Sequence, residues 1–287
     1  MDLKKETKEF TLLLRAKLIG NTAEANANAR DTYVKRHGEI SQANILENIS
    51  SIISQIFIIQ RETFEKAIQE IESNWINYVL DFSDDQHKFS TYVDAPSKIN
   101  SILDSTEGSL YKTQKLLGVL APIQSPLSFS NKQAGKTRGG SALESHLEYL
   151  FNKLNMKFDT QKTPLITGGG EKFDFIFPDI ERFERISNDC MLCEAQATLK
   201  DRFRLTQGKA QTVPTNKYLF TAGGAGIVRA NDTVNDFTLT KLDELQSKDV
   251  TLVVLKEVKE DINHPIMRSY EEFVGNEYPT QEMRWDA

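Results

Sequence analysis

The chain has 287 residues, 39% hydrophobic and 26% charged, which is typical of a globular protein with one large domain or two smaller ones. Its net charge of −6 argues against coating nucleic acid by bulk attraction, although a local basic cleft, acting within about 10 Å, is compatible with it. No apolar run approaches the roughly 20 residues that cross a bilayer, and no secretory signal is visible, so we expect a cytoplasmic protein with no membrane partner.

Residues 1–120 are predicted to form a helical N-terminal domain. Apolar side chains recur at helical spacing over residues 63–82, and an isoleucine-rich stripe runs along residues 43–60. A stripe of this kind needs an apolar partner. It forms either the core of the helical domain or a surface shared with a second subunit.

Residues 121–141 break the helical pattern, and we interpret them as a linker loop. Two prolines and three glycines punctuate a polar stretch that contains no acidic residue. A basic loop with glycines is suited to contact phosphate, and the alternative is a solvated interdomain linker. The basic residues of this loop are Lys132, Lys136 and Arg138.

Residues 142–287 are predicted to form an α/β domain. A helix with leucines on one face is followed by apolar, strand-like runs and by helical segments between some of them, which indicates a sheet with helices on both sides. The predicted strands are residues 173–180, 191–197, 217–221 and 250–258, and the later helices are residues 201–211, 240–247 and 270–277. The two cysteines, Cys190 and Cys193, fall in one of these strands, so we expect them to be buried and reduced.

Acidic side chains interrupt two apolar strands that follow each other in the chain. Asp174 lies in the first strand, and the second carries Glu194 and Gln196, which alternation places on one face. If the strands are neighbours, these three side chains converge on one point. Mg²⁺ prefers oxygen ligands and is held by one or two carboxylates, so the pattern predicts metal binding by Asp174 and Glu194, with Glu144 as a third carboxylate through water.

The structural alternative for Glu194 is a buried salt bridge to Lys209 or Arg202, because an unpaired buried carboxylate is costly. A mixed charged segment follows the second strand directly and contains Lys200, Asp201, Arg202 and Arg204. Arginine and lysine donate to guanine, and aspartate accepts from cytosine, so such a cluster is able to contact G·C base pairs. The alternative is a solvated helix N-terminus. An acid in each of two successive strands, followed by a segment rich in basic residues, favours a metal-dependent nuclease.

At these residues the chain resembles the catalytic domain of type II restriction endonucleases of the EcoRII, SsoII and PspGI group, within the PD-(D/E)xK nuclease superfamily. The similarity covers roughly residues 132–277. Residues 134–136 and 142–150 look like the family's glycine-bearing loop and glutamate-bearing helix, residues 173–178 like its metal-aspartate strand, and residues 197–204 like its Lys-Asp-Arg-Trp-Arg recognition stretch.

The resemblance implies a restriction-endonuclease-like fold, with a mixed central sheet flanked by helices. It implies metal ligation by Asp174 assisted by Glu144, and base contacts from Lys200, Asp201 and Arg202. It further implies cleavage of double-stranded DNA with Mg²⁺ by a homodimer, at a near-palindromic site of the kind that begins CC and ends GG.

The chain departs from the family pattern at two catalytic positions. The group usually has a lysine where this chain has Gln196 and a glutamate where it has Lys209. One interpretation is a swap, in which Glu194 supplies the carboxylate and Lys209 the cation, which places Lys209 within a few ångströms of Glu194. In the second interpretation Gln196 itself replaces the lysine and orients water through hydrogen bonds. In the third the site is damaged, and the protein binds DNA without cutting it.

The favoured interpretation is a homodimeric, sequence-specific endonuclease whose N-terminal domain serves dimerisation and DNA clamping. Asp174 and Glu194 hold metal, Glu144 supports them, and Gln196 or Lys209 orients the water. The alternatives are a less specific repair-type nuclease, an inactive DNA-binding module, and a helical interaction protein whose sheet is only a scaffold.

Overall fold

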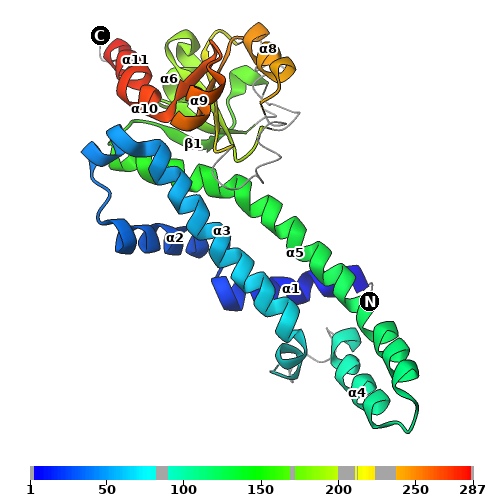
Figure 1. Cartoon of the computed structure of the whole chain (residues 1–287). Coiled ribbons are helices and arrows are strands. Elements are labelled where there is room, and N and C mark those ends of the chain that lie inside the picture. The colour runs from blue at the N-terminus through cyan, green and yellow to red at the C-terminus, as the bar shows by residue number, and fades with distance from the viewer. Residues whose placement is uncertain are drawn as a thin grey trace. The chain divides into compact units, whose positions relative to one another are not determined.

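A computed structural model describes residues 3–81, 90–168, 172–199, 211, 213–223 and 237–285 (Figure 1). Contacts divide the chain into two compact units. The helical unit comprises Met1–Ala25 and Arg61–Arg138, and the sheet unit comprises Asn26–Gln60 and Gly139–Ala287.

The helical unit has a core of its own. It is formed by α1 (Leu3–Ile19), the later part of α3 (Gln42–Asp81), α4 (Ser90–Asp104) and the first part of α5 (Ser109–Lys153). Phe10 stacks on Tyr92, with 4.4 Å between their ring centroids, and the buried Arg15 donates to Asn131 over 3.0 Å. The apolar core is completed by Leu14, Ile71, Trp75, Ala95, Ile123 and Leu127.

The predicted loop at residues 121–141 lies within helix α5. Pro122 and Pro126 are inside this helix, although each proline removes one backbone hydrogen bond. Ile123 and Leu127 stand four residues apart and are buried in the helical unit, so their burial offsets the unfavourable helix propensity of the prolines. The segment is therefore helical and not a loop.

The isoleucine stripe also differs from the expectation. Residues Asn26–Gln60 pack with the sheet unit, and the stripe lies inside that unit's core, so it forms neither the core of a separate N-terminal domain nor an exposed subunit surface. The single departure from helical geometry in α3, at Asn48, falls within the stripe. The buried isoleucines are Ile45, Ile49, Ile52, Ile53 and Ile56.

The sheet unit is built on a mixed sheet of six strands in the order β1-β2-β3-β4-β5-β6. Strand β2 pairs antiparallel with both β1 and β3, and the remaining pairs are parallel. This arrangement confirms the predicted mixed central sheet. The strands are β1 (Asp159–Lys162), β2 (Phe173–Phe177), β3 (Met191–Gln196), β4 (Asn216–Thr221), β5 (Val250–Val254) and β6 (Met267–Ser269).

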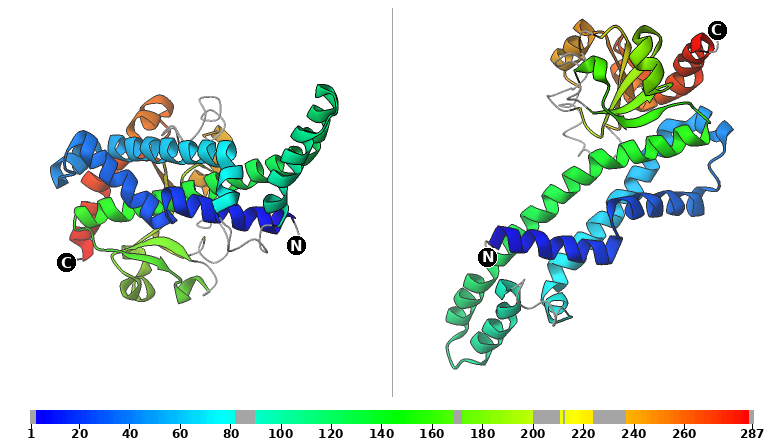
Figure 2. Two further views of the ribbon diagram at one scale, coloured as in Figure 1. Left: turned by 90° about the horizontal axis from the view of Figure 1, so that it is seen from below. Right: turned by 180° about the vertical axis from the view of Figure 1, so that it is seen from behind.

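Helices surround this sheet, and the C-terminal part of α5 runs along it (Figures 1 and 2). The other helices of the sheet unit are α2 (Thr22–His37), which begins in the helical unit, the first part of α3, α6 (Ile180–Arg185), α8 (Leu239–Ser247), α9 (Lys256–Ile262), α10 (Tyr270–Glu272) and α11 (Tyr278–Trp285). A π-helix, Phe273–Glu277, separates α10 from α11, and short 3-10 turns occupy Leu165–Thr167 and Ser187–Asp189.

Three predicted strands are shorter in the structure, the second of them by a single residue, since β3 ends at Gln196. The first ends at Phe177, before Pro178, and the last ends at Val254, where Leu255 caps helix α9. Strands β1 and β6 were not predicted, because β1 has no apolar alternation and β6 has only three residues. Residues 201–210, predicted as helical, lie outside the described residues.

One face of the sheet is packed with phenylalanine. Phe175 and Phe177 of β2 and Phe220 of β4 contact Phe151 of α5, with ring centroids 5.5 to 5.8 Å apart. Phe273 closes the cluster, with its centroid 4.9 Å from that of Phe220. Because side chains alternate along a strand, the residues between these phenylalanines point to the opposite face. That alternation determines where the acidic side chains lie.

Candidate carboxylate site

Asp174 is a buried acid in β2, the strand next to the edge strand β1. Only 2% of it is exposed. Its Oδ2 accepts a hydrogen bond from the backbone N–H of Ala195 over 2.7 Å, so the carboxylate reaches across to strand β3. A buried carboxylate needs such donors, because an ionised group without partners is costly to take out of water.

Glu194 and Gln196 of β3 lie on one face, as alternation predicted. Nε2 of Gln196 donates to Oε1 of Glu194 over 2.8 Å, and Glu194 is also 2% exposed. The half-buried Gln196 therefore acts as a donor to the carboxylate of its neighbour. Its amide contributes no charge.

The strand register brings the two acids together. The β2–β3 ladder pairs Phe175 with Cys193, and the next residues along both strands are Asp174 and Glu194. Residues opposite each other in an antiparallel pair point to the same face, with Cβ atoms about 4.5 to 5.5 Å apart. The structure thus confirms that the two strands are neighbours in the sheet, which the candidate site requires.

A fourth side chain, which sequence reasoning missed, joins this group. Nε2 of Gln161 in β1 donates to Oε2 of Glu144 over 2.9 Å and to Oδ1 of Asp174 over 3.1 Å. Glu144 comes from α5, so the contact links that helix to the sheet. No sequence signal marked Gln161, because β1 is short and polar. We call Glu144, Asp174 and Glu194, with the amides of Gln161 and Gln196, the carboxylate cluster.

The cluster fits Mg²⁺ by the chemistry of its donors. All of its acids are hard oxygen ligands, and Asp174 and Glu194 stand one residue beyond the paired residues Phe175 and Cys193 on neighbouring strands. Within the described part of the chain, no three His, Cys, Asp or Glu side chains are grouped so as to hold a metal ion. The two buried acids of the cluster, Asp174 and Glu194, suffice for this ion, because Mg²⁺ is usually bound by one or two carboxylates with several waters.

Most of the residues predicted to contact DNA lie outside the part of the chain that the structure describes. Lys200, Asp201, Arg202, Arg204 and Lys209 lie outside the described residues, and so do the side chains of Lys136 and Arg138. Lys132 is exposed on α5, in the helical unit. The interpretation that Lys209 exchanges roles with Glu194 therefore stays a prediction.

Two lysines bind the backbone on either side of the predicted recognition segment. Nζ of Lys241 donates to the carbonyl of Leu199 over 3.1 Å, and Nζ of Lys217 donates to the carbonyl of Gln211 over 2.9 Å. Burial lowers the pKa of Lys217, and nearby Asp249 partly opposes this. These contacts fix the chain just before residue 200 and just after residue 210.

A buried polar network lies on α5 two residues beyond Glu144. Nη1 of Arg30 contacts Nδ1 of His146 at 3.3 Å, and Nε2 of His146 contacts Oε1 of Gln60 at 3.3 Å. Burial and the adjacent Arg30 charge lower the pKa of His146 to about 3, so the ring is neutral. With Arg30 as the donor, Nδ1 accepts and Nε2 carries the proton. The network joins α2, α3 and α5 inside the sheet unit.

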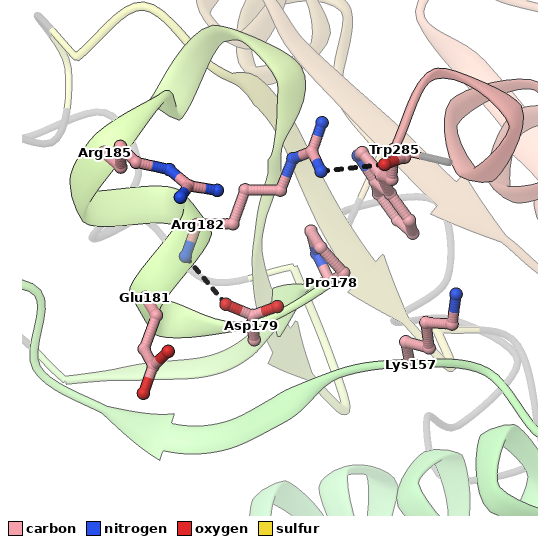
Figure 3. A pocket seen from close by; sticks show the side chains of 7 residues that line it. All are labelled: Lys157, Pro178, Asp179, Glu181, Arg182, Arg185 and Trp285. Atoms are coloured by element: carbon pink, nitrogen blue, oxygen red, sulfur yellow. Dashed lines mark hydrogen bonds between the residues drawn. The ribbon is translucent and has the colours of Figure 1, made fainter. Parts of the chain in front are cut away.

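A separate cavity of about 260 Å³ opens beside α6 and the end of α11 (Figure 3). Asp179 caps α6 by accepting from the backbone N–H of Arg182 over 2.7 Å, and Nη1 of Arg182 donates to the carbonyl of Trp285 over 2.9 Å. No member of the carboxylate cluster lines this cavity. Its lining residues are Lys157, Pro178, Asp179, Glu181, Arg182, Arg185 and Trp285.

The cysteines are buried and free, as predicted. Burial raises the pKa of the Cys190 thiol to about 11 and that of Cys193 well above its ordinary value, which disfavours the reactive thiolate. Within the residues that the structure describes, no helix is both long enough and apolar enough to cross a membrane.

Comparisons with known proteins give one family and one fold. The family model described as EcoRII C terminal matches residues 113–273. Two solved structures of metal-depleted Ecl18kI, in complex with uncleaved modified DNA and with uncleaved DNA, superpose with TM-scores of 0.73 and 0.72 at 17% identity. They cover 99% and 98% of this chain and 86% of theirs.

A third solved structure, of restriction endonuclease PspGI in a complex with substrate DNA, superposes with a TM-score of 0.53 at 13% identity. It covers 90% of this chain and 93% of that one. No curated protein matches the chain. The structural matches confirm the predicted restriction-endonuclease-like fold.

Proposed function

Because this chain belongs to the EcoRII C-terminal family, we propose that it is a type II restriction endonuclease, which hydrolyses phosphodiester bonds of double-stranded DNA at a specific sequence with Mg²⁺. The observation that carries the proposal is the pair of buried carboxylates on β2 and β3. Asp174 accepts from the backbone N–H of Ala195, which follows Glu194 in the chain, and this contact supports the pairing of the two acids in one site.

Asp174 and Glu194 would hold the metal, and Glu144 would support it. A bound Mg²⁺ supplies a site for the scissile phosphate and makes its water a better nucleophile. The protein's own part is to hold the two buried carboxylates in place on neighbouring strands. Gln196 donates to Glu194 and so fixes its carboxylate, and either Gln196 or Lys209 orients the attacking water.

DNA recognition is assigned to the segment after β3. Lys200, Asp201, Arg202 and Arg204 would contact bases, as the family resemblance implies, and the lysine contacts at Leu199 and Gln211 hold the two ends of this segment. The local basic residues of α5, Lys132, Lys136 and Arg138, would bind phosphates.

We assign a homodimer to this chain as well. A near-palindromic DNA site calls for two copies related by a twofold axis, because each copy then contacts one half-site. The helical unit is the candidate for dimerisation and DNA clamping. Sedimentation of the protein with and without DNA would measure the number of copies directly.

The test is digestion of a large DNA of mixed sequence with Mg²⁺, followed by sequencing of the ends. Discrete fragments with a common end sequence support the proposal, whereas a smear indicates a less specific nuclease. Binding without cleavage in either Mg²⁺ or Mn²⁺ indicates an inactive DNA-binding module, the outcome that a damaged site with Gln196 in place of lysine would give.

Asp174→Asn should reduce cleavage by more than about 100-fold, the upper limit for residues that only support ligands, while DNA binding persists. The matched control is Asp189→Asn, at a partly exposed aspartate of the 3-10 turn Ser187–Asp189, which should leave cleavage unchanged. Equal cleavage by both variants and the parent would contradict the assignment of Asp174.

A further inference from the structure

One amide nitrogen lies between two of the acids of the carboxylate cluster. Nε2 of Gln161 is 2.9 Å from Oε2 of Glu144 and 3.1 Å from Oδ1 of Asp174. Gln161 is exposed, Glu144 is half-buried and Asp174 is buried. The amide therefore covers the outer side of the cluster, between the buried aspartate and the surface.

The orientation of this amide follows from chemistry. An ionised carboxylate only accepts hydrogen bonds, so the group that faces both acids must be the NH₂ and not the carbonyl oxygen of Gln161. The NH₂ has two hydrogens, which is one for each acid. It thereby offsets the repulsion between the two neighbouring carboxylates. The carbonyl oxygen of Gln161 at the same place would increase this repulsion.

The backbone of Gln161 is also unusual. Its φ of 54° is left-handed, although it lies in a strand and carries a full side chain. The ladder pairs Thr160 with Phe175 and Lys162 with Phe173, so Gln161 is opposite Asp174. A left-handed conformation is strained for a residue with a Cβ and persists only where the surroundings hold it. Here the two carboxylates anchor the side chain.

We propose that Gln161 is a positioning residue for the cation site. Its amide holds Asp174 and Glu144 in one arrangement while the cation is absent, and so sets how tightly the site takes a divalent ion. The inference rests on the proposed function, since it assumes that the carboxylate cluster is where the divalent cation binds.

Two variants test it, with metal binding followed by thermal unfolding of the full-length protein without DNA. Gln161→Leu keeps the size of the side chain but removes both donors, so the Mg²⁺ or Mn²⁺ concentration needed for a given rise in melting temperature should increase by about 10- to 100-fold. Gln161→Glu places a fourth carboxylate in the cluster. It should lower the melting temperature without metal and enlarge the stabilisation by Mn²⁺, because it adds an oxygen ligand.

The matched control is Gln246→Leu, at an exposed glutamine of α8. It should leave the metal titration unchanged. Cleavage by Gln161→Leu should recover at high Mg²⁺, which a variant that had merely lost its fold would not do.

The results separate the inference from the function on which it rests. If the parent protein is stabilised by Mg²⁺ and cleaves DNA, and Gln161→Leu gives the same titration, the role of Gln161 is refuted and the nuclease stands. If the parent protein is neither stabilised by a divalent ion nor able to cleave, both are refuted.

Discussion

Ala195 donates its backbone N–H to the carboxylate of Asp174 across the β2–β3 boundary, over 2.7 Å. Ala195 stands between Glu194 and Gln196, so this one bond ties the acid of β2 to the short segment of β3 that carries the other two side chains. The same aspartate then has both a structural and a proposed chemical role, and the two can be separated by substitution.

Asp174→Ala should be less stable than Asp174→Asn by about 1 to 3 kcal/mol, because alanine leaves the buried N–H of Ala195 without an acceptor, whereas asparagine retains an oxygen. Neither variant should cleave DNA, since both lack the carboxylate. Urea denaturation compares their free energies of unfolding. Equal stabilities would show that the Ala195 contact contributes nothing.

Gln196→Glu should slow cleavage by about 10- to 100-fold at a fixed Mg²⁺ concentration, because it removes the amide that donates to Glu194 and puts a second carboxylate beside it. The measurement is the initial cleavage rate. The control is Gln246→Glu on α8, which should leave the rate unchanged. An unchanged rate in the Gln196 variant would contradict the role of this amide.

His146 should make the protein less stable in mild acid. Its pKa falls from 6.5 in the unfolded chain to about 3 in the folded protein, so between these values the unfolded state binds more protons. Stability is therefore unaffected well above pH 6.5 and is lost progressively as the pH falls from 6.5 towards 3.

His146→Gln removes this proton uptake, while its amide can still accept from Arg30 and donate to Gln60. Its loss of stability from pH 7 to pH 4.5 should be smaller than that of the parent protein by about 2 kcal/mol. Denaturation at the two pH values checks this. An identical pH dependence in both proteins would mean that His146 is not buried in its neutral form.

Ser50 connects α3 to helices α9 and α10. Its backbone N–H and its hydroxyl donate to Glu271 over 2.9 and 2.7 Å, and its hydroxyl accepts from the backbone N–H of Lys256 over 2.9 Å. Ser50 is buried, whereas the adjacent Ser51 is exposed on the same helix. The two serines thus differ in surroundings but hardly in helix position.

Ser50→Ala should destabilise the protein by about 1 to 3 kcal/mol, because it leaves the N–H of Lys256 and the carboxylate of Glu271 each short of a partner. Ser51→Ala should change the free energy of unfolding by no more than about 0.5 kcal/mol. Thermal and urea denaturation of the pair measure the difference. Equal stabilities of the two variants would show that the side-chain hydrogen bonds of Ser50 contribute nothing.

Much of the sheet unit could be predicted from local pattern. Apolar runs marked β2, β3, β4 and β5, and the interruption of two of them by Asp174 and Glu194 was visible because a charged group in an apolar strand is costly. The resemblance to the EcoRII group named the family that the comparison with family models confirmed.

Patterns failed where tertiary contacts outweigh local preference. The prolines of α5 indicated a loop, but Ile123 and Leu127 are buried on one side of a continuous helix. The predicted domain boundary near residue 120 was wrong for Asn26–Gln60, which belongs to the sheet unit. The spacing of the isoleucines specifies an apolar face of a helix, but not the surface that covers this face.

By itself the sequence determined which side chains share a face of a strand, since alternation is a local property of the backbone. The relations between strands were decided only by the tertiary structure. Pairing and register placed Asp174 beside Ala195 and Glu194, and the left-handed turn of β1 brought Gln161 over Glu144 and Asp174. Register depends on contacts between residues distant in the chain, which no local pattern encodes.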